Sequence, residues 1–219
     1  MAVLSSNTVW SKVERVQADL SRLFCGFSLE SYASLSDTEI DERFVPWFED
    51  RRAGSPHLKR NLKLLIRAAQ KLLRYRKRHG RADRYFTSLV DQCDGDPKRA
   101  ALLIGDQSEY KLPSLGIALA AEALKNLGFD VAKPDQHVLR AVGSFGLVPF
   151  KRWKRTLRGR ESPDSTSGEK LKVMTVVEGI AAAVDHPVVF VDNAIWLLCA
   201  RDEAYLTNSE LEELASNSR

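Results

Sequence analysis

The sequence has few of the residues that hold metal ions or form disulfides. Only three cysteines, Cys25, Cys93 and Cys199, occur among 219 residues, and no two of them form a Cys-x-x-Cys pair. The four histidines show neither HxxxH nor HExxH spacing. Three separated cysteines exclude a four-cysteine zinc or iron–sulfur site, so we expect no metal and no cofactor. An odd number of cysteines without a signal sequence is typical of reduced thiols in a cytoplasm.

Long apolar runs are also missing. No run approaches the roughly 20 residues that a membrane-spanning helix needs. The first 16 residues lack a basic segment followed by an apolar one, so we expect no secretory signal peptide. Hydrophobic residues make up 44% of the chain and charged residues 28%, which is ordinary for a folded globular protein and excludes general disorder.

Charge of both signs is present, but it is segregated. The formal net charge is only +4. Residues 51–84 hold 13 basic residues and one acid, Asp83, and residues 149–160 hold six basic residues and no acid. These segments carry +18 together, which leaves −14 for the rest of the chain. This pattern indicates either a polyanion partner, most simply nucleic acid, or two solvated helix faces.

The spacing of apolar residues is helical almost throughout, and it predicts an all-α protein. Ser36 and Glu39 have the spacing of a capping box, and Asp96-Pro97 is a typical helix start. Residues 159–169 are polar and predict a loop, whereas the 188–191 run fits a strand or a helix. We expect helices over residues 9–23, 36–50, 56–79, 84–92, 98–104, 117–127, 135–142, 170–184, 193–200 and 208–215.

One turn carries a specific signal. Residues 112–116 read Leu-Pro-Ser-Leu-Gly between two predicted helices, the second of which is rich in alanine. Small residues in such a turn let a duplex backbone approach, and Gly116 is expected to adopt a conformation that other residues resist. Amide groups at the start of the second helix can then bind a phosphate without reading the base sequence. The alternative is an ordinary corner between two helices.

Asp135 follows Gly116 by 19 residues, after the alanine-rich helix and a short connector. With this spacing, residues 98–146 resemble the helix-hairpin-helix DNA glycosylase superfamily, the relatives of endonuclease III and of the alkylpurine and oxoguanine glycosylases. A weaker likeness extends to residues 36–73 and 190–199. The matching residues are Leu112, Pro113, Gly116, Asp135, His137, Val138 and Arg140.

The resemblance implies a two-lobed helix-hairpin-helix glycosylase fold with DNA between the lobes. Residues 31–128 would form a helical barrel lobe that ends in the hairpin. Residues 1–30 and 129–219 would form the second lobe, which carries the catalytic aspartate.

The resemblance also implies an activity. Asp135 would cleave the N-glycosidic bond of a base flipped out of the duplex, by activating water or by stabilising the oxocarbenium ion. Bifunctional relatives have a lysine two residues after the last glycine of the hairpin, where this chain has Ala118, so we expect no lyase activity. Lys111 and Lys133 lie nearby in sequence but do not match. The alternative role for Asp135 is a plain helix cap.

Further site residues come from the same segment and from the basic run after it. Trp153 lies among cations without a neighbouring acid in sequence, which favours a nucleic-acid edge. The alternative for each aromatic residue is core packing, a structural role is preferred for His137, and Asp192 is expected to cap a helix. We expect DNA contacts at Leu112, Pro113, Ser114, Leu115, Gly116, Ala118, Lys151 and Arg152, and a base pocket at Trp153, Tyr110 and His137.

The sequence therefore predicts a monomeric, monofunctional DNA glycosylase of base excision repair. It would act on double-stranded DNA with a damaged or modified base, in the cytoplasm at the nucleoid. A second hypothesis is a non-catalytic DNA-binding module. One departure from the family favours it, because Ser114 replaces the first glycine of the hairpin. A third hypothesis is a helical protein whose basic faces bind RNA or an acidic protein, which leaves the hairpin-to-aspartate spacing unexplained.

Overall fold

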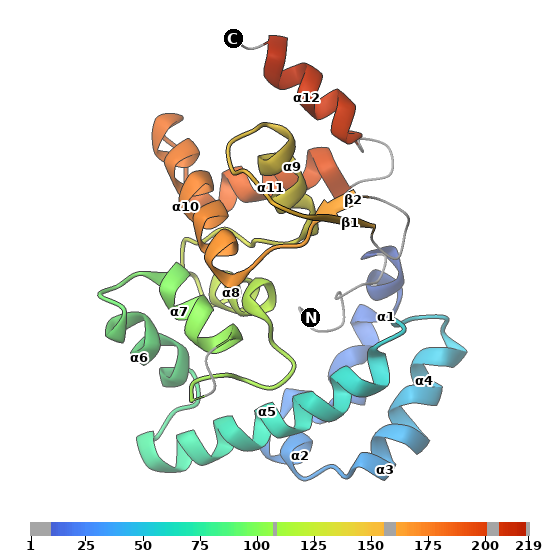
Figure 1. Cartoon of the computed structure of the whole chain (residues 1–219). Coiled ribbons are helices and arrows are strands. Elements are labelled where there is room, and N and C mark those ends of the chain that lie inside the picture. Colours follow the sequence, from blue (N-terminus) through green and yellow to red (C-terminus); the bar gives the residue numbers. More distant parts are fainter. Residues whose placement is uncertain (1–9, 107–108, 156–160, 201–205, 218–219) are drawn as a thin grey trace. The chain divides into compact units, whose positions relative to one another are not determined.

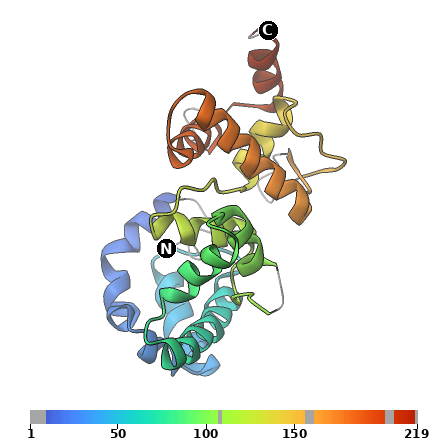
Figure 2. The ribbon, with the colours of Figure 1, turned by 90° about the vertical axis from the view of Figure 1, so that its left-hand side faces the viewer.

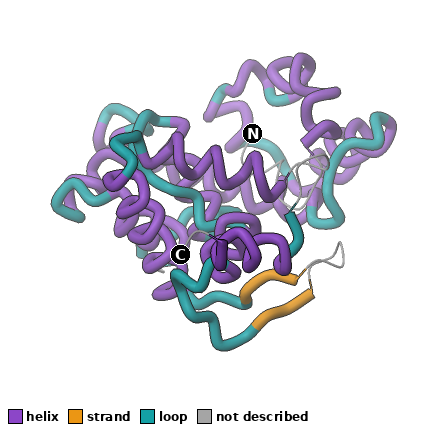
Figure 3. Tube along the Cα trace, turned by 90° about the horizontal axis from the view of Figure 1, so that it is seen from above, coloured by secondary structure: helices purple, strands orange, loops and turns teal. Residues whose placement is uncertain are grey.

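The protein is helical over nearly all of its described length, which confirms the all-α class. The structure, a computed structural model, describes residues 10–106, 109–155, 161–200 and 206–217. Two short strands are the only extended elements in these ranges (Figure 3). The chain divides into two compact units, Met1–Leu89 with Lys111–Leu115, and Val90–Tyr110 with Gly116–Arg219.

The first unit is built around one long helix. Its α-helices, labelled in Figure 1, are α1 (Trp10–Leu23), α2 (Leu29–Ala33), α3 (Asp37–Glu39), α4 (Val45–Asp50), α5 (Leu58–His79) and the part of α6 (Arg84–Gln92) up to Leu89. A 3₁₀ turn (Cys25–Phe27) and a π-helical turn (Ile40–Phe44) complete the unit. Leu62 and Ile66 of α5 pack in one core with Leu20 of α1 and with Phe44. The predicted 9–23, 56–79 and 84–92 helices are therefore present within two residues of their expected ends, apart from residue 9, which lies outside the described residues.

The second unit surrounds α9. Its elements are α7 (Pro97–Gly105), α8 (Ile117–Asn126), α9 (Gln136–Ser144), β1 (Trp153–Arg155), β2 (Glu161–Pro163), α10 (Ser167–Ala183), α11 (Val188–Ala200) and α12 (Asn208–Asn217). Helix α9 contacts β2, α10, α11 and α12. Five consecutive residues of α9, from Val138 to Val142, are buried, so this short helix is the centre of the unit. Views from two sides show α7 and α8 packed next to each other (Figure 2).

Side-chain caps fix where several helices begin. Ser36 and Glu39 form the predicted capping box, and the Asp96 carboxylate accepts hydrogen bonds from the amides of Lys98 and Arg99. Thr166 and Glu169 form a second capping box, which starts α10. Each cap satisfies amide groups that have no partner within their helix.

Two local predictions were wrong. Strand β2 lies in the 159–169 segment that was expected to be a loop, and it pairs antiparallel with β1, with Trp153 opposite Pro163. Helix α11 begins at Val188, so the ambiguous apolar run is helical and the expected start at residue 193 is too late. The predicted 36–50 helix is present over Asp37–Asp50, and a π-helical turn at Ile40–Phe44 interrupts its ordinary hydrogen-bond pattern.

The division into units also differs from the lobes expected from the sequence. Residues 1–30 were expected with residues 129–219, whereas α1 belongs to the first unit through its contacts in the α5 core. The apolar stripe of α1 predicts that it is buried on one face, but the stripe does not say which helix covers it.

No single described helix is long and apolar enough to cross a membrane. Helices α10 and α11 pass that test only as a pair that is bent by 107°.

Candidate nucleic-acid interface and active site

Helices α7 and α8 approach each other closely at one glycine. A β-carbon added to Gly105 would lie 2.4 Å from the backbone nitrogen of Ile117 and 2.5 Å from its α-carbon. Ala100, Ala101, Ala120 and Ala121 are also fully buried in these two helices. Small side chains therefore set the spacing of the pair, and Gly105 was not among the residues singled out from the sequence.

The connection between the two helices has nearly the length that the predicted 98–104 and 117–127 helices leave for it. It covers residues 106–116, of which 107 and 108 lie outside the described residues. Its last part contains a turn in which the Leu115 amide donates to the Leu112 carbonyl over 3.1 Å. Leu112 is buried and Pro113 is half-buried.

The unusual backbone of this turn lies at Ser114 rather than at Gly116. Ser114 has φ +72°, in the left-handed region that favours glycine. Gly116 has φ −90° and ψ 175°, an extended conformation that any residue adopts, and a β-carbon there would meet open space. The expectation that Gly116 takes a special conformation is therefore wrong.

Helix α8 starts without a side-chain cap. Gly116 is its N-cap residue and offers no acceptor, in contrast to Asp96 of α7 and Asp135 of α9. The amides of the first turn are therefore not bonded by a capping side chain, and Ala118 is half-buried there. Uncapped amides at a helix start attract anions.

Asp135 caps α9 with one carboxylate oxygen and keeps the other away from the helix. Its Oδ1 accepts from the amides of His137 (2.9 Å) and Val138 (3.2 Å). Its Oδ2 lies 3.8 Å from the Lys133 ammonium, which also lies 3.5 Å from Glu122. The Asp135 side chain is 16% exposed. The capping role is thus observed, and it uses only Oδ1, so Oδ2 takes no part in the cap.

Two contacts with α11 hold the connector that leads to Asp135. Asp130 accepts from the amides of Val188 and Val189 at the start of α11, at 3.0 and 2.8 Å. In return, Asp192 of α11 accepts from the Lys133 amide over 2.9 Å. The connector is therefore fixed to one helix on both sides of Val131 and Ala132, which are themselves buried.

Asp192 is a buried ion-pair partner and not the helix cap that the sequence suggested. It lies within α11, its side chain is 3% exposed, and its Oδ2 is 2.6 Å from the Lys125 ammonium. Burial raises the pKa of Asp192 above its ordinary value, although Lys125 and the Lys133 amide act in the opposite direction. This role is not visible in the sequence, because the pairing joins residues 67 positions apart.

Arg140, one of the family-matching residues, lies in the interior of the second unit. It is 2% exposed, and its guanidinium donates to the Cys199 carbonyl (3.0 Å) and to Asn208 Oδ1 (3.2 Å). These bonds join α9 to the end of α11 and the start of α12. A buried charge needs such partners, so Arg140 stabilises the unit around α9.

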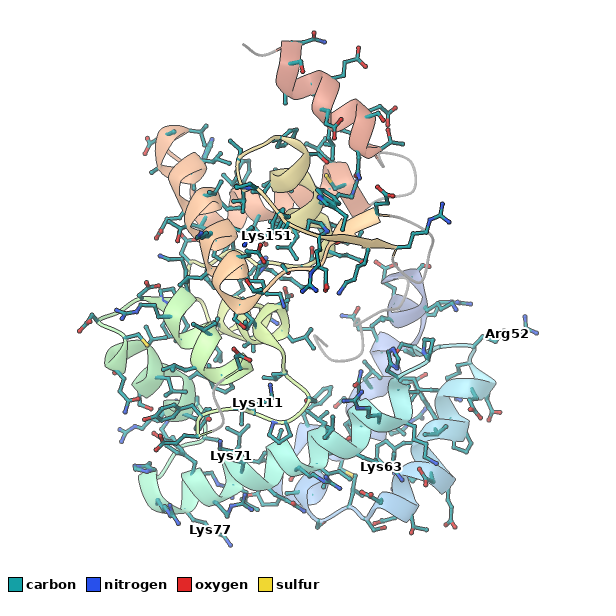
Figure 4. All side chains as sticks on the ribbon, in the orientation of Figure 1. Arg52, Lys63, Lys71, Lys77, Lys111 and Lys151 are labelled. Carbon is teal, nitrogen blue, oxygen red and sulfur yellow. The ribbon has the colours of Figure 1, made fainter. Side chains whose placement is uncertain are left out.

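Two cations of the basic segment after α9 lie close to one acidic residue, Asp164. Asp164 lies 2.7 Å from the Lys154 ammonium and 3.8 Å from Arg152, and these cations lower the pKa of the Asp164 carboxyl. The interpretation of an acid-free surface around Trp153 was therefore wrong, because the β1–β2 pairing brings Asp164 next to it. Lys151 is exposed (Figure 4). The rest of this run, residues 156–160, lies outside the described residues.

Trp153 is the most exposed of the proposed pocket residues. It is 39% exposed, and its ring meets the Phe150 ring edge to face at 6.3 Å. A β-carbon at Gly143 would lie about 3 Å from both rings, so this glycine lets the aromatic pair rest on α9. His137 and Tyr110 are half-buried, and Gln136 Nε2 lies 3.2 Å from His137 Nε2. No described group of three metal-binding side chains forms a metal site.

Comparison with known proteins identifies no relative: no family model, no curated protein and no solved structure matches the chain.

Proposed function

We propose that the protein is a monofunctional DNA glycosylase that removes a flipped damaged base from duplex DNA, with Asp135 as its catalytic carboxylate. The proposal includes the finer fold assignment, a helix-hairpin-helix glycosylase fold. The observation that carries it is the geometry of the Asp135 carboxylate. One of its oxygens caps α9, and the other lies beside Lys133. A fixed carboxylate of this kind can activate water or stabilise the oxocarbenium ion.

The hairpin supports the DNA part of the proposal. Gly105 keeps α7 and α8 close, and α8 begins without a capping side chain after the Leu112–Leu115 turn. The uncapped first turn of a helix is a common phosphate site. Lys151 and Arg152 add positive charge on the second unit. Contacts of this kind bind the backbone whatever the base sequence is.

The test is base release from duplexes that carry uracil, hypoxanthine, an alkylated purine or 8-oxoguanine, followed by alkaline cleavage at abasic sites. Asp135→Asn keeps an oxygen that can cap α9 but removes the carboxylate. We expect it to lower the rate of release by about 100- to 10,000-fold, the usual contribution of a catalytic acid or base. Thermal unfolding should change little.

Asp96→Asn is the matched control. Asp96 caps α7 through the same two-amide pattern, and it lies outside the proposed site. Loss of release in Asp135→Asn with normal release in Asp96→Asn supports the proposal. Equal rates in Asp135→Asn and the unaltered protein would remove Asp135 from the mechanism.

Two further outcomes separate related functions. The second candidate is a non-catalytic DNA-binding module, which Ser114 in place of a glycine favours; it would bind the duplexes and release no base from any of them. Strand cleavage without alkali, with a borohydride-trapped complex, would contradict monofunctional chemistry. If that complex is absent in Lys133→Gln, then the amine beside Asp135 forms the Schiff base.

A further inference from the structure

Helix α5 carries a straight line of cations along its outer side. Arg67, Lys71, Arg74 and Arg78 follow Arg60 at separations of 7, 11, 14 and 18 residues, which are close to whole numbers of helical turns. The line therefore stays on one side of the helix over about 27 Å. The opposite side of α5 is buried in the core of the first unit. We call these five residues the α5 cationic line.

The acids of the first unit pair with cations that lie next to the four arginines of the line. Asp41 lies 3.0 Å from Lys59 and 2.9 Å from Lys63, and Glu30 pairs with Arg76. Within the ranges that the structure describes, no carboxylate lies within 4.0 Å of Arg60, Arg67, Arg74 or Arg78. Like charges three and four residues apart destabilise a helix, so the line has a cost that an anionic partner would offset.

A groove runs beside the first part of the line. It has a volume of about 440 Å³ and is open to solvent. Four of its side chains are cationic and one is acidic. The lining consists of Asp37, Pro56, Lys59, Arg60, Lys63, Leu64 and Arg67.

The same line reaches the hairpin turn. The Lys71 ammonium donates to the Lys111 carbonyl over 2.9 Å, and Lys111–Leu115 belong to the same compact unit as α5. Figure 4 shows Lys71 next to Lys111, with Lys63 and Lys77 further along α5 on either side. The α5 cationic line and the turn are therefore neighbouring parts of one unit.

We propose that the α5 cationic line binds the phosphate backbone of duplex DNA and extends the contact that begins at the Lys111–Leu115 turn. The choice of DNA as the polyanion rests on the proposed function. A row of positive charge about 27 Å long fits a polymer whose negative charge repeats evenly. Insertion into a bilayer is disfavoured because the apolar side of α5 is buried in the core.

The test measures binding of an undamaged fluorescent duplex to the full chain between 50 and 200 mM salt. Two exposed arginines of the line are changed together, Arg67→Gln with Arg74→Gln. The matched control changes Arg22→Gln with Arg81→Gln, two exposed arginines that already pair with Asp19 and Asp83. Both variants lose the same formal charge, and thermal unfolding checks that both are folded.

The salt slope is the slope of the logarithm of the binding constant against the logarithm of the salt concentration. Each lost phosphate contact makes it shallower by about 0.9, so we expect a slope shallower by about 1.8 for the line variant. The affinity advantage of the unaltered protein over this variant should then shrink about 12-fold across that salt range. The control pair should leave the slope within about 0.5 of the unaltered protein. An unchanged slope in the line variant, or an equal change in both variants, overturns the proposal.

Two competitors test other polyanions. Vesicles of phosphatidylserine and phosphatidylcholine, or polyglutamate, are added at equal charge. Binding of vesicles or polyglutamate that is lost in the line variant, while duplex binding is kept, overturns the proposal in favour of a membrane or an acidic protein. Because the duplex is undamaged, failure of base release and failure of the α5 contact are distinguishable.

Discussion

Ser114 combines two unfavourable features in one residue. Its backbone has a left-handed conformation at φ +72°, which costs a non-glycine residue about 1–2 kcal/mol. Its buried hydroxyl oxygen has no hydrogen-bond partner among the described residues. A buried polar group without a partner costs about 1–3 kcal/mol. Such features persist where a turn has a role beyond stability.

Glycine at this position should stabilise the protein. Ser114→Gly removes both costs. The greater freedom of glycine in the unfolded chain opposes this gain by about 0.5–1 kcal/mol. We expect a net gain of about 1–2 kcal/mol in the free energy of unfolding, measured by urea denaturation. Ser114→Ala is the control, because it removes the hydroxyl and keeps the strained backbone. A Ser114→Gly protein that is less stable than Ser114→Ala would show that the backbone strain is not significant.

Single residues differ in how far the sequence predicts their roles. The spacing from the hairpin singled out Asp135, and the structure confirms the predicted cap on α9, which one carboxylate oxygen makes. The roles of Lys125 and Asp192 could not be predicted, because their ion pair joins the end of α8 to α11 across 67 positions of the sequence. Asp164 was overlooked beside the basic run for the same reason: a strand pairing brings it there.

At the scale of elements, the α7–α8 pair depends on Gly105. Gly105→Ala would place a β-carbon about 2.5 Å from the Ile117 backbone, which has no flexible end that can move away. Overpacking of this kind costs about 1–3 kcal/mol or more. We expect a loss of about 3 kcal/mol in the free energy of unfolding, with weaker duplex binding.

Gly116→Ala gives the comparison. Its added β-carbon would meet open space, and its backbone is already extended, so the loss should stay near 1 kcal/mol. Urea denaturation of both variants provides the measurement. Similar losses at the two positions would mean that the close approach at Gly105 does not set the spacing of the helices.

Elements were predictable where one strong local signal decided them. The apolar stripe and the glycine after His79 give α5 within two residues, and Asp96-Pro97 gives the start of α7. The β1–β2 ribbon was not predictable from its polar sequence, since its pairing is stabilised by contacts with α9. The start of α11 at Val188 was missed because its amides are capped by Asp130, a residue 58 positions earlier.

At the scale of the whole molecule, stability should depend on pH in two opposing ways. Hydrogen bonds from Lys63 and Lys59 to Asp41 lower the pKa of its carboxyl. Stability from Asp41 is therefore present above its ordinary pKa near 4 and is lost as the pH falls through the lowered value. The contribution of Asp192 to stability changes with pH in the opposite direction, because burial raises its pKa in the folded chain.

Asp192→Asn isolates that second contribution. As the pH rises from about 4 through the raised pKa of Asp192, the folded chain must give up a proton that the unfolded chain has already lost. The free energy of unfolding of the unaltered protein minus that of Asp192→Asn should therefore fall over this window. Denaturation at a series of pH values measures it, with Asp41→Asn as a control of opposite sign. A difference that rises with pH for Asp192→Asn would contradict the assignment.

The segregation of charge is visible in the sequence, but its meaning depends on the fold. Counting residues gives the +12 of residues 51–84. Only the structure separates Lys59 and Lys63, which acids of the same unit neutralise, from the arginines of the α5 cationic line. The helical class follows from local periodicity, whereas the grouping of helices into two units depends on long-range contacts that periodicity does not contain.

The connector between α8 and α9 has a consequence for the length of the chain. Asp130 caps α11, and the Lys133 amide donates to Asp192 of that same helix. One inserted or deleted residue between these two attachments would shift Lys133 and Asp135 together relative to α11, and one attachment would be lost. The three-residue separation of Asp130 and Lys133 is therefore fixed, and a change of length within it would displace Asp135 from α11.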